Sequence, residues 1–267
     1  MNTQLIIICF LTFVIHLVGT LAYSVRIAGV RTRRIAVSFA LFNILILVSR
    51  TSNSFQGPFL AKRVESNLGA GGSHDLLLDF RWFLLSATFG TLVGAFLTPT
   101  FQRVFSKAVA SLQVHHSIPR LVLHAFSKGG LAHIKDSVSV PVSAHITSLH
   151  FGRAISPQIV ALNVAAVALW TVGVFAALYA GYLDPRFRVT ASTLSSIVNG
   201  VATILMFVLI DPQLSVMTDD VVDGKLGEPC FRRAIVWLVG SRCAGTLLAQ
   251  VLLVPAAGLI AYVAQRL

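Results

Sequence analysis

The chain has 267 residues, of which 55% are hydrophobic and 12% charged, and its mean hydropathy is +0.80. A soluble domain carries about 25% charged residues, so this composition excludes an ordinary cytosolic enzyme, and the high apolar content excludes a disordered chain. The formal net charge is +11, but the basic residues flank apolar runs, which favours anionic membrane lipids as their partners and not nucleic acid.

Six apolar stretches are long enough to cross a bilayer, for which a helix needs about 20 residues. In chain order they cover residues 5–25, 35–55, 76–97, 159–183, 189–210 and 234–263. Backbone groups cannot stay unpaired in lipid, so the sequence predicts an all-α integral membrane protein with about six transmembrane helices. No basic region precedes the first stretch, which we therefore interpret as a span and not as a signal peptide.

Basic residues near the ends of the spans indicate their orientation. The loop after the first span, residues 103–153 and the loop before the last span together carry most of the Lys and Arg residues. Such residues favour the cytoplasmic side of a membrane. We therefore expect these three segments to lie inside and both chain ends to lie outside.

The stretch between the third and fourth spans is too long to be a bare turn. Apolar residues recur there with helical spacing, while Arg103 and Lys107 lie elsewhere on the helical wheel. This pattern predicts an amphipathic helix in the membrane interface, and a second one is expected over residues 119–132. We expect residues 100–157 to form an interfacial amphipathic connector between two halves of the protein.

The two halves show a weak similarity at a nearly constant offset. Residues 90–92 and 245–247 both read Gly-Thr-Leu, and each triplet is followed by a proline. Asn43 matches Asn199, and Tyr23 matches Tyr179. The pattern predicts two three-helix units, residues 1–99 and 158–267. Since three spans is an odd number, the second copy would enter the membrane with opposite polarity, as in transporters whose sites lie between inverted repeats. Chance matching of small residues is the alternative.

Two arginines fall within the predicted spans, where a charge costs at least about 2.5 kcal/mol and usually marks a pathway or a site. Arg50 lies in a polar run that continues to Gln56, and Arg242 lies about a third of the way along the sixth span. A guanidinium group can hold phosphate through two parallel hydrogen bonds, so both are candidates for binding an anionic lipid headgroup. The alternatives are that Arg50 snorkels to the outer interface and that Arg242 pairs with Asp79 or Asp211.

Further polar groups lie within or near the spans, and several of them around one cavity would indicate a binding site. These groups are His16, Asn43, Asn53, Asn163, Asn199 and Gln250. Any single one is more often a bridge between helices, and His16 is also a candidate proton relay.

Four arginines follow the first span. They are Arg26, Arg31, Arg33 and Arg34. They fit two interpretations equally: they bind a lipid pyrophosphate at the inner face, or they set the orientation of the spans in the membrane.

Several kinds of chemistry have no matching pattern. Six histidines between the third and fourth spans, His115, His116, His124, His133, His145 and His150, lack the tight spacing of metal ligands. The sequence contains no nucleotide-binding glycine-rich loop and no clustered carboxylates. We therefore expect no metal, no cofactor and no enzymatic activity.

Residues 16–26 and 33–43, read as HLVGTLAYSVR and RRIAVSFALFN, resemble the alternate lipid II flippase family, Amj. The likeness continues through residues 47–51, Phe55, Gln56, Pro58 and residues 60–65, and it is strongest over residues 11–65. The resemblance implies a multi-pass protein of the bacterial plasma membrane that moves the undecaprenyl-pyrophosphate-linked peptidoglycan precursor from the inner to the outer leaflet. The substrate is then this precursor lipid, and the oligomeric state stays open, a homo-oligomer included.

On this basis we predict a polar cavity in which arginines receive the pyrophosphate in turn, in an alternating-access cycle. The predicted contacts are Arg26, Arg31, Arg33, Arg34, Asn43, Arg50, Asn53, Gln56, Asn199 and Arg242. A secondary transporter or channel for a small solute is the second interpretation, and a membrane-embedded lipid phosphatase or transferase is the third. A wide, laterally open cavity would favour the lipid, whereas a narrow occluded pocket would favour a small solute.

Overall fold

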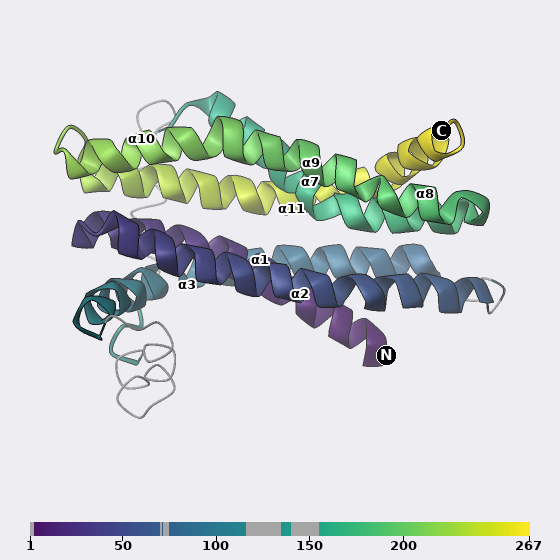
Figure 1. Cartoon of the computed structure of the whole chain (residues 1–267), viewed down its shortest axis with the longest axis horizontal. Coiled ribbons are helices and arrows are strands. Elements are labelled where there is room, and N and C mark those ends of the chain that lie inside the picture. The colour runs from purple at the N-terminus through teal and green to yellow at the C-terminus, as the bar shows by residue number, and fades with distance from the viewer. Residues whose placement is uncertain (1–2, 70, 72–74, 116–134, 140–154) are drawn as a thin grey trace.

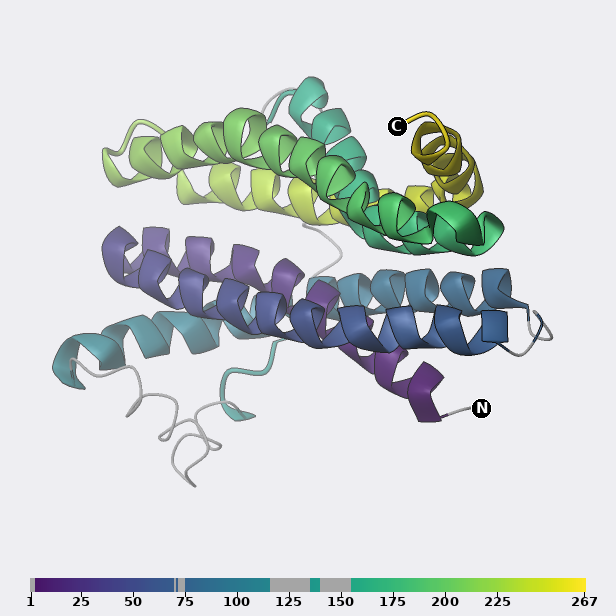
Figure 2. The same cartoon turned by 45° about the vertical axis from the view of Figure 1, so that its right-hand side comes forward.

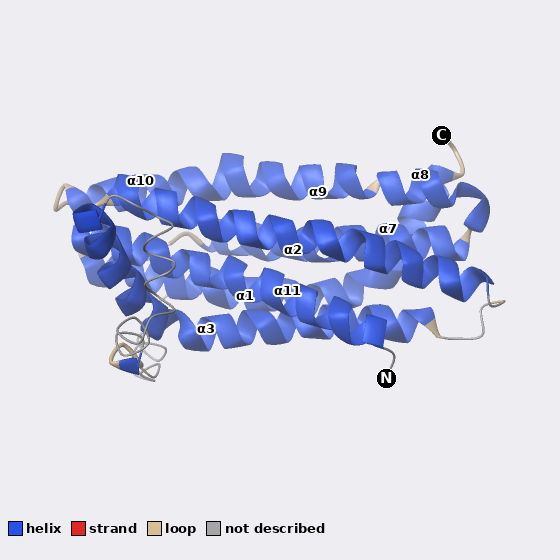
Figure 3. Ribbon diagram, turned by 60° about the horizontal axis from the view of Figure 1, so that its bottom comes forward, coloured by secondary structure: helices blue, strands red, loops and turns tan. Residues whose placement is uncertain are grey.

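The computed structural model describes residues 3–69, 71, 75–115, 135–139 and 155–267. Within these residues every regular element is helical (Figures 1 and 3). The first half contains α1 (Thr3–Thr32), α2 (Ile35–Gly69) and α3 (Leu76–His115). The second half contains α7 (Pro157–Leu183), η1 (Pro185–Phe187), α8 (Arg188–Thr193), α9 (Ser195–Ile204), the π-helical η2 (Leu205–Ile210), α10 (Asp211–Val222) and α11 (Glu228–Ala264).

Six helical segments of the described chain are long and apolar enough to cross a membrane, and the run from η1 to α10 counts as one of them. The prediction of an all-α membrane protein with six spans is therefore confirmed. The helices are longer than the apolar stretches, because backbone hydrogen bonding continues beyond the apolar stretch that would lie in the hydrocarbon layer. α3 runs on through Pro99 to His115, so the amphipathic stretch that begins at Phe101 forms the end of α3. The predicted helix at 119–132 lies outside the described residues.

The helices form two layers (Figure 1). In the first layer, α1 packs against both α2 and α3, and in the second, α7 packs against α9 and α11. The most extensive single contact between the layers is the one between α3 and α11. Both chain termini lie at one end of the bundle, and the turns between α1 and α2 and between α10 and α11 lie at the other (Figures 1 and 2). We call this second end, which carries Arg26, Arg31, Arg33 and Arg34, the arginine end.

Glycines allow the third helix of each half to approach the first helix closely. A Cβ atom on Gly94 of α3 would lie 2.8 Å from Cβ of Thr20 on α1. A Cβ atom on Gly245 of α11 would lie 2.8 Å from the carbonyl oxygen of Val164 on α7. Gly90, the predicted counterpart of Gly245, also packs directly on the backbone of α1. The matched triplets thus lie at corresponding helix contacts in the two halves.

Prolines lie inside the last parts of α3 and α11, at Pro99 and Pro255. A proline removes one helical hydrogen bond and its ring clashes with the preceding turn, which bends a helix. Each helix changes direction near its proline (Figure 2) and stays packed beyond it: Val109 of α3 lies in a cluster with Val25 and Leu41, and Ala257 and Ile260 of α11 are buried in the core. The bend therefore redirects the end of each helix without separating it from the bundle.

Asp184 holds the corner at which α7 passes into η1. Its carboxylate accepts hydrogen bonds from Nε and Nη2 of Arg186, at 3.0 and 2.9 Å, and from Nε2 of Gln265, at 2.9 Å. The hydrogen bonds from Arg186 are the main cause that lowers the pKa of Asp184 to about 2. The ionised carboxylate thereby ties the end of α11 to the end of α7.

The crossing of α11 and α7 yields a first prediction. Gly245→Ala should lower the midpoint of thermal unfolding in detergent, because overpacking of a close contact typically costs about 1–3 kcal/mol. Gly240→Ala is the matched control, since Gly240 lies on the same helix, is exposed and would place its Cβ in open space. Alanine there should leave the midpoint unchanged or raise it. Equal midpoints for the two variants would refute this description of the crossing.

Candidate functional site

A row of buried polar residues runs along one face of α1 at intervals of four residues. Thr12, His16, Thr20 and Ser24 are each at most 3% exposed. The hydroxyls of Thr12 and Thr20 donate to backbone carbonyls one turn earlier, at 2.8 Å. The Nδ1 atom of His16, in contrast, is buried and has no hydrogen-bond partner. Buried polar atoms are paired in most proteins, so His16 marks a place where a partner is missing.

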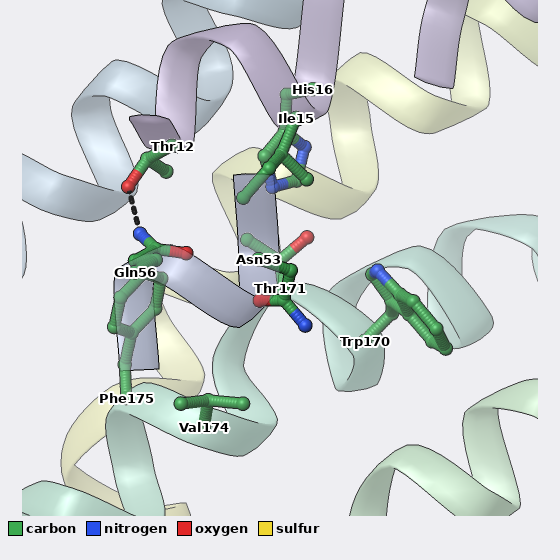
Figure 4. A pocket seen from close by; sticks show the side chains of 9 residues that line it. All are labelled: Thr12, Ile15, His16, Asn53, Gln56, Trp170, Thr171, Val174 and Phe175. Carbon is green, nitrogen blue, oxygen red and sulfur yellow. Dashed lines mark hydrogen bonds between the residues drawn. The ribbon is translucent and has the colours of Figure 1, made fainter. Parts of the chain in front are cut away.

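His16 lines a small cavity between α1, α2 and α7 (Figure 4). The cavity has a volume of about 30 Å³, which is enough for a water molecule. The Nε2 atom of Gln56 donates to the hydroxyl of Thr12 on one side of it. The complete lining consists of Thr12, Ile15, His16, Asn53, Gln56, Trp170, Thr171, Val174 and Phe175. Asn53 is exposed, so the cavity opens toward the surface of α2.

Arg242 of α11 lies against α1 less than one turn from His16. Its side chain is 7% exposed, and its guanidinium rests on Gly19, where a Cβ atom would come within 2.5 Å of Nη2. Its Nε atom is buried without a hydrogen-bond partner, and Arg242 forms no ion pair with another described residue. Gly19 and His16 are three residues apart on α1, so they are neighbours on one face of the helix. A buried cation without a counterion is costly, and an anionic ligand would remove that cost.

The acids proposed as structural partners of Arg242 pair with other arginines. Asp79 lies 2.7 Å from Nη2 of Arg63, and Asp211 lies 2.8 Å from Nη2 of Arg26. The interpretation of Arg242 as part of a structural ion pair with either acid is therefore wrong. Both acids lie in the first turns of their helices, whereas Arg242 lies about 21 Å along α11 at 1.5 Å per residue.

Arg50 lies near the middle of α2, about 22 Å from its first residue. It shares one face of the helix with Asn53 and Ser54, and all three are exposed. We call these three residues the α2 polar face. Charged and polar side chains at this depth in a membrane protein face the bundle interior or water and not lipid. Because Asn53 also lines the cavity, the α2 polar face leads toward His16.

The four arginines of the arginine end do not form one cluster. Arg26 is buried, pairs with Asp211 and lies over the rings of Phe39 and Phe42, at 5.6 and 5.2 Å. Arg31 pairs with Glu228, at 2.9 Å.

The other two arginines lie in the turn before α2. Arg33 has a positive φ of 53°, and both Arg33 and Arg34 are exposed. The structure thus separates two arginines that join the layers from two that face outward.

The structure does not bring the two matched asparagines to the cavity. Asn43 is exposed on α2, and Asn199 packs against Gly173 of α7, where a Cβ atom would lie 2.5 Å from Oδ1 of Asn199. The interpretation as helix bridges is confirmed for two other residues. Asn163 donates to the hydroxyl of Ser241, at 2.7 Å, and Gln250 donates to the carbonyl of Arg81, at 3.1 Å.

Sequence reasoning missed Thr12, Trp170 and Thr171 as cavity residues and did not place His16 among the substrate contacts. The four-residue spacing of polar side chains on α1 is a signal that could have found Thr12 and His16. Of the histidine cluster, His115 ends α3 and the others lie outside the described residues. Where the chain is described, it contains no group of His, Cys, Asp and Glu suited to a metal ion.

Comparison with known proteins adds independent findings. Residues 11–264 match the model of a family described as Amj, alternate to MurJ. Lipid II flippase Amj of Bacillus subtilis (strain 168) is 36% identical over 262 residues, which are 97% of this chain and 95% of that protein. No solved structure matches the chain significantly.

The exposure of the α2 polar face yields a second prediction. In a chain whose three native cysteines are replaced, Asn53→Cys should react with a charged, membrane-impermeant thiol reagent, because the thiolate forms only in contact with water. Val48→Cys is the control, since Val48 lies on the same helix and is also exposed, but on the opposite side from Arg50, in line with the exposed Phe55. Labelling measured by mass spectrometry should be fast at position 53 and negligible at position 48. No labelling at position 53 from either side of the membrane would show that this face is dry.

Proposed function

Because the chain belongs to the Amj family, we propose that it is a lipid II flippase of the bacterial plasma membrane. It moves the undecaprenyl-pyrophosphate-linked peptidoglycan precursor from the inner to the outer leaflet and supplies cell-wall synthesis. The protein is a multi-pass transporter of this lipid, not an enzyme. The observation that supports the mechanism best is Arg242, a buried cation without a counterion beside a polar cavity in the middle of the bundle.

The polar headgroup is the physical obstacle to flipping, since each polar group costs kilocalories to move unpaired through hydrocarbon. The α2 polar face supplies exposed hydrogen-bonding groups at the depth where the headgroup would otherwise meet lipid tails. We propose that the headgroup passes along this face while the polyprenyl tail stays in the bilayer. Along this face, Arg50 receives the pyrophosphate before Arg242, which receives it behind the cavity.

The headgroup does not fit into a cavity of about 30 Å³, so the two layers have to separate during the cycle. We propose that they open beside α2, because the main contact between the layers is on the opposite side, between α3 and α11. The small cavity by itself also suits a small anion. A secondary transporter for such a solute is therefore the second candidate function, and the α2 polar face favours the lipid.

Ion pairs between the layers are candidate gates for alternating access. At the arginine end, Arg26 pairs with Asp211 and Arg31 with Glu228. At the other end, Arg188 of α8 lies 3.7 Å from Glu65 of α2. We propose that an arriving pyrophosphate competes with Asp211 for Arg26 and thereby opens the arginine end.

The exposed arginines at that end complete the proposed entrance. Arg33 and Arg34 are free to attract the headgroup, and Arg103 and Lys107 on the end of α3 are exposed as well. We propose that these groups also hold anionic lipids, as basic residues next to membrane helices do.

The two halves suit an inverted repeat of residues 1–99 and 158–267. α1 and α7 run in opposite directions (Figure 1). Each of them packs against the second and third helices of its own half, and Gly90 and Gly245 lie at the corresponding crossings. We propose that the halves rock against each other around the site between them.

The membrane potential can drive the transport without nucleotide hydrolysis. An anion that leaves a negative interior moves downhill by about 2.3 kcal/mol per charge per 100 mV. Consumption of the precursor outside the cell adds to this gradient. The directed movement therefore needs only a binding site and two gates.

A third prediction concerns Arg242. Arg242→Ala should reduce lipid II export at least about tenfold, because a hydrogen bond to a charged group contributes about 1.5–3 kcal/mol. Arg242→Lys should retain part of the activity, since it keeps the charge but loses the planar fork. The measurement is growth of cells depleted of their other lipid II exporters, together with exposure of lipid II at the outer surface.

Arg233→Ala is the matched control, since Arg233 lies on the same helix and is exposed. It should export like the parent protein at equal amounts in the membrane. Full export by Arg242→Ala would remove Arg242 from the mechanism, whereas failure of the parent protein to support growth would contradict the flippase function itself.

A further inference from the structure

The proposed function leaves His16 without a role. Its side chain is 3% exposed and lies in the middle of α1, where it lines the cavity with its Nδ1 atom unpaired. Burying an unsatisfied polar atom costs about 1–3 kcal/mol, and an apolar residue at this position would avoid that cost. The imidazole therefore places an unpaired, titratable nitrogen at the cavity.

His16 and Arg242 lie at a similar depth on neighbouring helices. His16 is about 24 Å from the last residue of α1, and Arg242 is about 21 Å from the first residue of α11, both measured from the arginine end. The contact at Gly19 brings the guanidinium against α1 less than one turn from His16. Two buried groups that can each hold a positive charge thus face the same part of the bundle interior.

Few other titratable groups surround His16. On α1 the nearest ones are Cys9 and Tyr23, each seven residues away, and on α11 Cys243 follows Arg242. α3 has no charged or titratable residue between Arg81 and Arg103.

The cavity itself adds only uncharged groups. α2 contributes Asn53 and Gln56, and α7 contributes Trp170 and Thr171. Arg50 of α2 is exposed, one turn before Asn53. Arg242, which contacts Gly19, is the buried charged group next to His16.

We propose that His16 and Arg242 together form the receptor for the pyrophosphate, and that His16 takes up one proton when the anion binds and releases it when the anion leaves. This inference rests on the proposed function. Without an anion, two adjacent positive charges in a dry site repel each other strongly. The pyrophosphate of lipid II carries two negative charges, one on each phosphoryl group, and balances a protonated imidazole and a guanidinium.

The proton has a route to the site. Asn53 is exposed and lines the cavity beside His16 (Figure 4), so water at the α2 polar face can deliver a proton to the imidazole and accept it again. On binding, the N–H bond of the imidazolium forms as an O–H bond of a hydronium ion breaks, and on release the proton returns to water. Each bound headgroup thus carries one extra proton, which links the affinity for the lipid to pH.

The sign of this link follows from mass action. Binding that takes up a proton becomes tighter as pH falls, by up to about tenfold per pH unit for one proton. The effect should appear between about pH 5 and 8, where histidine changes its charge. Both phosphoryl groups of lipid II are esterified and stay singly charged in this range, so a pH dependence reports on the protein.

The test measures binding of fluorescently labelled lipid II to the full chain in nanodiscs over this pH range. The parent protein should bind more tightly at low pH, whereas His16→Gln should bind with an affinity that does not change with pH. Thr20→Ser is the control, because Thr20 is buried one turn away on the same helix and has no titratable group. It should follow the parent profile.

Titration calorimetry in buffers of different ionisation enthalpy counts the protons directly and does not depend on the folding of a variant. We expect close to one proton taken up per lipid bound by the parent protein near the middle of this range. Binding without proton uptake, or a pH dependence that His16→Gln retains, overturns the role of His16 and leaves the flippase function standing. Absence of lipid II binding by the parent protein at every pH overturns both.

Discussion

The cost of burying the charge of Arg242 is the constraint on which the site depends. An arginine in the middle of an apolar bundle, resting on Gly19 and lacking a carboxylate partner among the described residues, is a group that the fold alone does not need. The burial of this charge is explained when Arg242 is a binding group whose counterion arrives with the substrate. The unpaired nitrogen of His16 and the polar cavity beside it are then parts of the same arrangement.

Five arginines of the helices fall into two classes with different roles. Arg26, Arg31 and Arg63 pair with carboxylates, and the first two join the layers at one end of the bundle. Arg50 and Arg242 lie at mid-depth without such partners. Paired charges hold a conformation together and can be released by a competing anion, whereas unpaired charges bind that anion. This division suits an anion that moves from the end of the bundle to its middle.

Much of the architecture could be predicted from the sequence, because the number of spans depends on local apolar content. The special position of Arg242 could be predicted for the same reason, since its neighbours in the sequence are apolar over more than a bilayer's thickness. The match of Asn43 with Asn199 misled the site prediction. The two residues correspond in spacing, but one is exposed and the other packs against Gly173, and neither lines the cavity.

The sequence by itself determined that six helices cross the membrane and that arginines lie within them, because hydropathy and helical length are properties of short stretches. Only the tertiary structure decided which acid neutralises which arginine. Arg26 and Asp211 are 185 positions apart and meet 2.8 Å from each other only because α1 and α10 pack side by side at the arginine end. Pairing between residues so far apart in the sequence depends on how whole helices pack, and no local sequence pattern records this packing.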